Sequence, residues 1–178
     1  MIFNLIERYN MNFVQQERKA DKDIVSNVTI KQGNILNADE QYLLHQCNCY
    51  TKNSKGLATK IFTQFPYSNT YVNRRADSEF GGMDICGNGR DQRYVINLYS
   101  QYHPGKPKSR SGFDSYSDRL NAFKKGLVEI FNIDNIESIA MPFNIGCGLA
   151  GGQWPDYFEV INNIPNERNI RIVLYKFE

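Results

Sequence analysis

Residues 141–155 read MPFNIGCGLAGGQWP, and this stretch decides how the rest of the chain is interpreted. The apolar residues 138–140 before it predict a buried strand, and residues 154–164 predict a helix with Pro155 in its first turn. Glycines let a backbone approach a phosphate closely, and the free N–H groups of a helix N-terminus point toward an anion. Strand, glycine-rich loop and helix therefore predict a cradle for a phosphate-bearing ligand.

Length and composition indicate a globular chain of one domain. The 178 residues are 41% hydrophobic and 13% aromatic, which is enough to bury a sizeable core. A net charge of +2 is too small to indicate a dedicated nucleic-acid binder. No stretch approaches the roughly 18 apolar residues of a membrane span. Glu7 and Arg8 interrupt the N-terminal apolar pattern, unlike a secretory signal, so we expect a cytoplasmic protein, with a nuclear location also open.

The cysteines and histidines indicate neither a disulfide scaffold nor a metal site. Cys47, Cys49, Cys86 and Cys147 are too few to hold together a chain of this length. The two histidines, at positions 45 and 103, show no zinc-ligand spacing with these cysteines. We therefore expect reduced cysteines, no metal and no cofactor.

The pattern of apolar residues divides the chain into an N-terminal extension, residues 1–26, and one domain, residues 27–178. Strand-like and helical patterns alternate through the domain, and a Gly-Asn-Gly turn predicts one hairpin. The predicted strands are residues 28–32, 42–47, 83–86, 93–99, 138–140 and 170–177, and the predicted helices are residues 56–65, 116–132 and 154–164. The alternation predicts an α/β fold, a three-layer α/β/α sandwich with a mixed, mostly parallel central sheet.

Three loops should meet where open α/β sheets bind their ligands, at the carboxyl ends of the strands. They are residues 33–35, residues 48–55 and the opening glycine loop. Two of them lead into helix N-termini, which suits a ligand with two phosphates.

Taken together, these loops resemble those of the macrodomain family, whose members bind ADP-ribose. Gly33-Asn34-Ile35 is similar to the family's Gly-Asp-Ile/Leu adenine loop. The segments HQCNC (45–49) and GLA (56–58) resemble the branch that includes the terminal ADP-ribose glycohydrolase and the yeast-type ADP-ribose 1''-phosphate phosphatase. Residues 141–154 resemble the glycine loop of that branch closely. The resemblance covers residues 28–177 and implies the macrodomain fold.

The resemblance also implies a role for each loop. Asn34 would face the adenine amine, Asn48 would bond the distal ribose, and the later loops would wrap the pyrophosphate with backbone amides. Tyr175 or Phe177 would stack on the adenine. The implied ligand-binding set is Gly33, Asn34, Ile35, Asn48, Ser54, Lys55, Gly56, Leu57, Phe143, Gly146, Cys147, Gly148, Leu149, Ala150 and Gly151.

The candidate catalytic residues are Asn48 and His45. Asn48 would position a hydroxyl or a water, and the similarity to the phosphatase makes His45 a candidate acid or base. The competing interpretation of His45 is a hydrogen-bonded core histidine. Cys147 has two interpretations as well, a packing residue or a thiol whose pKa is lowered by its helix-entry loop.

Three positions depart from the family pattern, and the last two of them leave catalysis open. Asn34 stands where the family usually has aspartate, which predicts weaker selectivity for adenine. The terminal glycohydrolase has a catalytic aspartate where this chain has Ala150. Its catalytic lysine corresponds to a position near Thr63 or Gln64.

The sequence therefore predicts a protein that binds ADP-ribose and hydrolyses a derivative of it. Candidate substrates are ADP-ribose 1''-phosphate, O-acetyl-ADP-ribose and a mono-ADP-ribosyl ester. The alternative is a non-catalytic reader of ADP-ribose. The expected partner is ADP-ribose or an ADP-ribosylated molecule, with no membrane. Nucleic acid is disfavoured because the basic loop at residues 103–115 comes without an aromatic platform.

Overall fold

One mixed sheet forms the centre of the computed structural model, which describes residues 27–108 and 113–177. The predicted extension, residues 1–26, lies outside the described residues. The described strands form a six-stranded sheet in the order β1-β6-β5-β2-β4-β3. Every pairing in it is parallel except the antiparallel pair β3–β4. The strands are β1 (Val28–Gln32), β2 (Tyr42–Asn48), β3 (Met83–Cys86), β4 (Tyr94–Gln101), β5 (Ser138–Pro142) and β6 (Arg171–Lys176).

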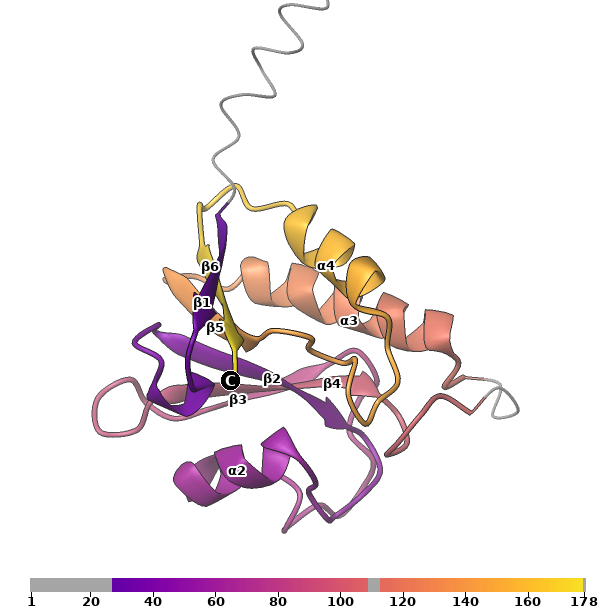
Figure 1. Ribbon diagram of the computed structural model, residues 1–178. Helices are drawn as coiled ribbons and strands as arrows, with labels where there is room; N and C mark the ends of the chain where they lie inside the picture. Colours follow the sequence, from indigo (N-terminus) through magenta and orange to yellow (C-terminus); the bar gives the residue numbers. More distant parts are fainter. Residues whose placement is uncertain (1–26, 109–112, 178) are drawn as a thin grey trace, which may run out of the picture.

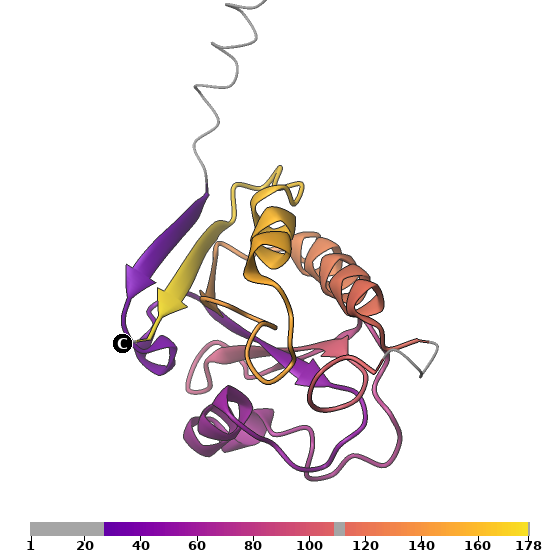
Figure 2. The ribbon, with the colours of Figure 1, turned by 45° about the vertical axis from the view of Figure 1, so that its right-hand side comes forward.

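Helices cover both faces of the sheet, as Figure 1 shows. Helices α3 (Tyr116–Phe131) and α4 (Trp154–Asn162) lie on one face, and α2 (Leu57–Gln64) lies on the other. Figure 2 shows the same separation after a turn of 45°. Two short 3-10 helices, η1 (Ile35–Asn37) and η2 (Pro66–Ser68), complete the described helices. This arrangement confirms the predicted three-layer sandwich with a mostly parallel sheet.

The two-residue period of the strands divides the core between the two faces. In β2, Leu43 packs in the cluster on the α2 side and Leu44 in the cluster on the α3–α4 side. Val95 and Ile96 in β4 divide in the same way. All four side chains are fully buried. A strand that is apolar at consecutive positions is therefore a central strand covered on both sides.

Local sequence signals set the ends of the helices. Ser115 caps α3, because its hydroxyl accepts from the Asp118 amide and the Asp118 carboxylate accepts from the Ser115 amide. Pro155 lies in the first turn of α4, as predicted, and this helix ends at Asn162, two residues before the predicted end at Ile164. The predicted hairpin is confirmed by the β3–β4 pair. No helix in the described part of the chain is long and apolar enough to cross a membrane.

Parallel pairing brings the ligand loops to one edge of the sheet. Strands β1, β6, β5, β2 and β4 run in the same direction, so their carboxyl ends share that edge. In Figures 1 and 2 the loop between β5 and α4 reaches toward the arrowhead of β2. The loops that follow β2, β4 and β5 therefore lie close together.

Candidate functional site

A cleft lies at this edge and consists of two adjoining cavities. The first, the Asn48 cavity, has a volume of about 470 Å³. The second, the glycine-loop cavity, has a volume of about 410 Å³. They form one cleft because both are lined by Gln46, Lys55, Ala58, Gln101 and Leu149.

Most of the predicted ligand-binding set lines this cleft. The members that do are Asn48, Lys55, Gly56, Leu57, Phe143, Gly146, Gly148, Leu149 and Ala150. The members outside the lining of both cavities are Gly33, Asn34, Ile35, Ser54, Cys147 and Gly151. The structure therefore brings together the loop after β2 and the glycine loop, while the predicted adenine loop is not part of the lining.

Asn48 holds the loop after β2 in place. Its Oδ1 accepts hydrogen bonds from the amides of Tyr50 at 3.1 Å and Thr51 at 2.7 Å. Its Nδ2 donates to the Tyr71 hydroxyl at 2.9 Å, and its own amide donates to the same hydroxyl at 2.7 Å. An amide nitrogen carries two hydrogens, so one N–H of Asn48 stays available to a ligand in its cavity. No sequence signal pointed to Tyr71, which reaches the cavity from beyond η2.

Arg74 is a second residue that sequence reasoning missed. It is buried, and its Nη1 donates to the Thr51 carbonyl at 2.8 Å. Its guanidinium lies 4.4 Å from the centre of the Tyr71 ring. Among the residues that the structure describes, no carboxylate forms an ion pair with Arg74. The guanidinium of Arg74 therefore places a positive charge beneath the loop after β2, at Thr51.

His45 lies on the α2 face of β2, and its ring is buried. Its Nε2 lies 2.6 Å from the Asn97 Oδ1, and its ring packs edge-on against Phe62. Burial lowers the pKa of His45 from 6.5 to about 4, although the hydrogen bond to Asn97 opposes this shift. The imidazole is therefore neutral near pH 7. His45 belongs to the lining of the glycine-loop cavity, and its catalytic role stays a prediction.

Two glycines of the opening motif are required by close packing. A Cβ on Gly146, whose φ is +75°, would lie 2.5 Å from Tyr157 Cε1 and 2.6 Å from Gln46 Oε1. A Cβ on Gly152 would lie 2.6 Å from the Gly146 carbonyl oxygen. A Cβ on Gly148, in contrast, would meet nothing within 4 Å, and Gly148 lines the cleft. The loop therefore packs on α4 through its ends and presents its middle to the cavity.

Leu149 crosses from the glycine loop to the start of α2. A Cβ on Gly56 would lie 3.4 Å from Leu149 Cδ1, although Leu149 is 66% exposed. Gly56 precedes α2 with φ +61°, and no side chain caps that helix. The first amides of α2 are therefore not occupied by a capping side chain, which favours an anion at this point.

A buried ion pair fixes the far wall of the cleft. The Arg119 side chain is only 1% exposed and donates hydrogen bonds to both carboxylate oxygens of Asp114, at 2.7 and 2.6 Å. Its Nη1 also donates to the carbonyls of Gly105 at 2.6 Å and Ala150 at 3.0 Å. Burial favours a raised pKa for Asp114, but the hydrogen bonds from Arg119 and the amides of residues 102 and 103 outweigh it and lower the pKa. Arg119 thus joins the glycine loop to the loop after β4, a role with no signal in the sequence.

The predicted adenine loop is shaped by its own hydrogen bonds. Asn34 Oδ1 accepts from the Leu36 amide at 3.0 Å and so caps η1. The Tyr175 ring is buried, and its hydroxyl donates to Glu40 at 2.8 Å. Phe177 is 66% exposed and lies beneath the Lys60 ammonium, 5.2 Å away. Of the two candidate stacking rings, Phe177 is the accessible one.

The cysteines behave as packing residues. Burial raises the pKa of Cys47 and of Cys49 to about 12. Burial and the nearby Asp156 carboxylate raise the pKa of Cys147 to about 11. The glycine loop therefore does not lower the pKa of Cys147, whose thiol donates a hydrogen bond to the Ile145 carbonyl at 3.2 Å. In the described ranges no three metal-ligating side chains gather into a possible metal site.

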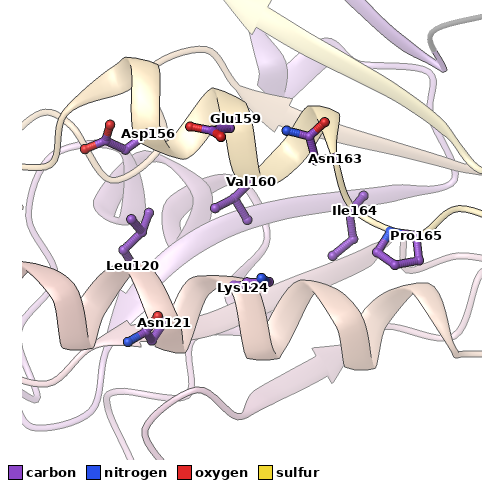
Figure 3. A pocket seen from close by; sticks show the side chains of 9 residues that line it. All are labelled: Leu120, Asn121, Lys124, Asp156, Glu159, Val160, Asn163, Ile164 and Pro165. Carbon is purple, nitrogen blue, oxygen red and sulfur yellow. The ribbon is translucent and has the colours of Figure 1, made fainter. Parts of the chain in front are cut away.

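A further hollow of about 350 Å³ lies between α3 and α4, away from the predicted residues. Figure 3 shows Leu120 and Val160 between the two helices, with Asp156 and Glu159 along α4. None of its nine labelled residues belongs to the predicted ligand-binding set. The cleft at the strand ends is therefore the better candidate site.

Sequence comparison finds distant relatives. No family model matches the chain. A DNA ADP-ribosyl glycohydrolase of Mycobacterium tuberculosis is 25% identical over 137 residues, which is 72% of this chain and 36% of the relative. A relative of the same name from Mycobacterium bovis matches equally well. The chain thus spans about a third of the length of these two relatives. An uncharacterized 17.5 kDa protein of Enterobacteria phage T4 is 24% identical over 78% of this chain and 88% of its own length.

Structural comparison shows the fold. The macrodomain of Mycobacterium tuberculosis DarG superposes with a TM-score of 0.67 at 22% identity, covering 84% of this chain and 96% of that one. The macrodomain of Thermus aquaticus DarG superposes with a TM-score of 0.61 at 23% identity, covering 85% and 97%. Thermosipho africanus DarTG in complex with ADP-ribose has a TM-score of 0.59 at 20% identity, covering 85% and 42%. The chain therefore has the macrodomain fold.

Proposed function

We propose that this chain binds ADP-ribose in the cleft and hydrolyses an ADP-ribose conjugate at the distal ribose. The observation that carries the proposal is the continuous cleft between the uncapped start of α2 and the glycine loop. ADP-ribose has two phosphates between two riboses, and a ligand of that length would span two cavities that share Lys55 in their lining. Lys55 lines both cavities, so its ammonium would face the pyrophosphate.

The Asn48 cavity would receive the distal ribose. The free N–H of Asn48 would bond a ribose hydroxyl, while Tyr71 and the loop amides keep the side chain oriented. The mid-loop Gly148 would bring backbone amides to the phosphates, since nothing lies near its open side. Catalysis would come from positioning and from the polar groups that surround the reacting ribose.

The substrate is a conjugate in which ADP-ribose is attached through its distal ribose. The curated relatives in the mycobacteria are named for ADP-ribosyl groups on DNA, so ADP-ribosylated DNA joins the candidate substrates. The others are ADP-ribose 1''-phosphate, O-acetyl-ADP-ribose and a mono-ADP-ribosyl ester. A reader without catalysis is the second candidate, because Ala150 and a position near Thr63 or Gln64 correspond to the aspartate and the lysine of a resembling glycohydrolase.

Calorimetry with ADP-ribose tests the binding step. We expect wild-type binding, a clear loss for Asn48→Ala, and a weaker, less salt-dependent complex for Lys55→Ala. Lys124→Ala is the matched control, because Lys124 lies in the separate hollow between α3 and α4. Absence of wild-type binding at millimolar ADP-ribose would refute the proposal.

Incubation of the protein with the four conjugates tests the chemical step. Release of ADP-ribose, or of inorganic phosphate from ADP-ribose 1''-phosphate, identifies the substrate by chromatography. Binding of ADP-ribose without turnover of any conjugate would leave the reader function. Turnover that survives Asn48→Ala would remove Asn48 from the catalytic step.

A further inference from the structure

The hollow between α3 and α4 has an apolar floor that the domain leaves partly open. Figure 3 shows Leu120 of α3 and Val160 of α4 on its two sides, with Ile164 and Pro165 at one end. Leu120 and Val160 are only half-buried. The hollow has a volume of about 350 Å³ and shares no lining residue with the cleft. An open apolar surface of this kind suits contact with another apolar segment.

Opposite charges line the two walls of the hollow. Asp156 and Glu159 lie on the α4 wall, and Lys124 lies on the α3 wall. Asp156 already accepts a hydrogen bond from the Tyr116 hydroxyl. Among the residues that the structure describes, neither Glu159 nor Lys124 forms an ion pair. The hollow therefore suits an apolar segment that carries one acidic and one basic side chain.

The chain enters the domain beside one end of this hollow. The Ile172 amide donates to the Asn27 carbonyl at 2.7 Å, which places the start of β1 beside the start of β6. Pro165 lies in the turn that leads into β6, residues 163–170. Figures 1 and 2 both show the start of β1 next to this turn, at the sheet edge opposite the cleft. A segment that precedes β1 is therefore tethered closer to the hollow than to the cleft.

Residues 1–26 lie outside the described residues, and their sequence has two parts. Nine of residues 1–14 are apolar, a higher share than the 41% of the whole chain. The only charged side chains in this first part are Glu7 and Arg8. Residues 15–26 include six charged side chains, and twelve residues of chain can span up to about 40 Å. Helix α4, which forms one wall, has nine residues and is only about 14 Å long. The tether is therefore long enough for the apolar part to reach any point of the hollow.

We propose that residues 1–14 of this chain bind in the hollow between α3 and α4. Their apolar side chains would cover Leu120 and Val160, and this burial would drive the contact. The adjacent acidic and basic side chains of the segment would pair with Lys124 and Glu159 and so fix its register. The bound segment would join the two helices on this face of the sheet. The inference goes beyond ADP-ribose binding and does not depend on it.

Photocrosslinking of the full chain tests the proposal. With p-benzoylphenylalanine in place of Tyr9, we expect products that mass spectrometry locates in residues 116–131 and 154–165. Val160→Glu should lower the yield of these products several-fold, because it puts an unpaired carboxylate into the apolar contact. Val128→Glu is the matched control and should leave the yield unchanged, since Val128 is 37% exposed on α3 and lies outside the hollow.

A change within the segment repeats the test without altering the domain. Leu5→Ser/Ile6→Ser removes two apolar side chains and should lower the same yield several-fold. Asn4→Ser/Asn12→Ser changes two polar positions of the segment and should leave the yield unchanged. Products that persist after Leu5→Ser/Ile6→Ser would overturn the proposal whatever Val160→Glu does, because apolar contact would then not hold the segment.

The location of the products separates the possible occupants. Products confined to the cleft lining, or an absence of products on α3 and α4, would overturn the proposal and leave the proposed function intact. In a mixture of isotopically heavy and light chains, products that join a heavy chain to a light one would assign the hollow to a second copy of the chain instead. Failure of the same wild-type protein to bind ADP-ribose in calorimetry would overturn the proposed function and leave this inference standing.

Discussion

Substitution of Arg119 by methionine should destabilise the protein more than any exposed charge change on the same helix. Methionine fills a similar volume but removes the donors to Asp114, Gly105 and Ala150. It leaves the Asp114 carboxylate fully buried without its cation. Removing one partner of a buried pair costs about 3–5 kcal/mol, because the remaining charge stays uncompensated.

The matched control is Lys125→Met on the same helix. Lys125 pairs with Glu79 at 2.7 Å, but the two side chains are 48% and 75% exposed. Such surface pairs contribute about 0–1 kcal/mol. Urea unfolding should therefore separate the two variants clearly. Thermal unfolding should show Arg119→Met lower by roughly 6 to 20 °C, given about 2–4 °C per kcal/mol for a domain of this size.

A third variant separates the lost charge balance from the lost packing. The double variant Asp114→Asn/Arg119→Met leaves no buried charge, so it should recover part of the stability that Arg119→Met loses. ADP-ribose binding should stay weakened in both, because Ala150 and Gly105 are no longer tied together. If Arg119→Met unfolds at the same urea concentration as Lys125→Met, the ion pair does not hold the wall of the cleft.

Three further perturbations follow from the geometry of the site. Gly146→Ala should lower the free energy of unfolding by about 1–3 kcal/mol, because the added Cβ would collide with Tyr157 and Gln46. Gly148→Ala is the control and should unfold like wild type, since its Cβ would meet no atom within 4 Å. Equal urea midpoints for the two variants would contradict the packing argument. The pKa of His45 is about 4 in the folded protein, below its ordinary value of 6.5, so the unfolded chain binds the proton first as the pH falls. The free energy of unfolding should therefore fall by roughly 3 kcal/mol between about pH 6.5 and about pH 4. Urea unfolding of His45→Gln should show a shallower fall over the same range, and an identical pH profile would speak against a buried neutral imidazole. Tyr71→Phe removes the hydroxyl that accepts hydrogen bonds from the Asn48 backbone amide and side chain, so calorimetry should show weaker ADP-ribose binding. Unchanged affinity would mean that other contacts orient Asn48.

The sequence predicted the layers and the start of α4 because their signals are local. Leu43 and Leu44 are both apolar, which indicates a central strand, and Pro155 marks the start of α4. The glycine loop was recognisable for the same reason, since its glycines follow one another within a single short motif. These features depend on residues close together in the chain.

The supporting residues of the site depend on distant contacts and had no such signal. Tyr71 reaches Asn48 across 23 positions, and Arg119 reaches Ala150 across 31. A lone arginine in an amphipathic helix normally lies in solvent, so nothing in α3 marked Arg119 as buried.

The position of Leu149 has a consequence for the speed of binding. Its side chain reaches from the glycine loop to Gly56 and lines both cavities. A ligand that occupies both cavities must therefore pass beneath a side chain that joins the two walls. Association and dissociation would then slow together, so a smaller residue at this position would shorten the lifetime of the complex more than it would change its affinity.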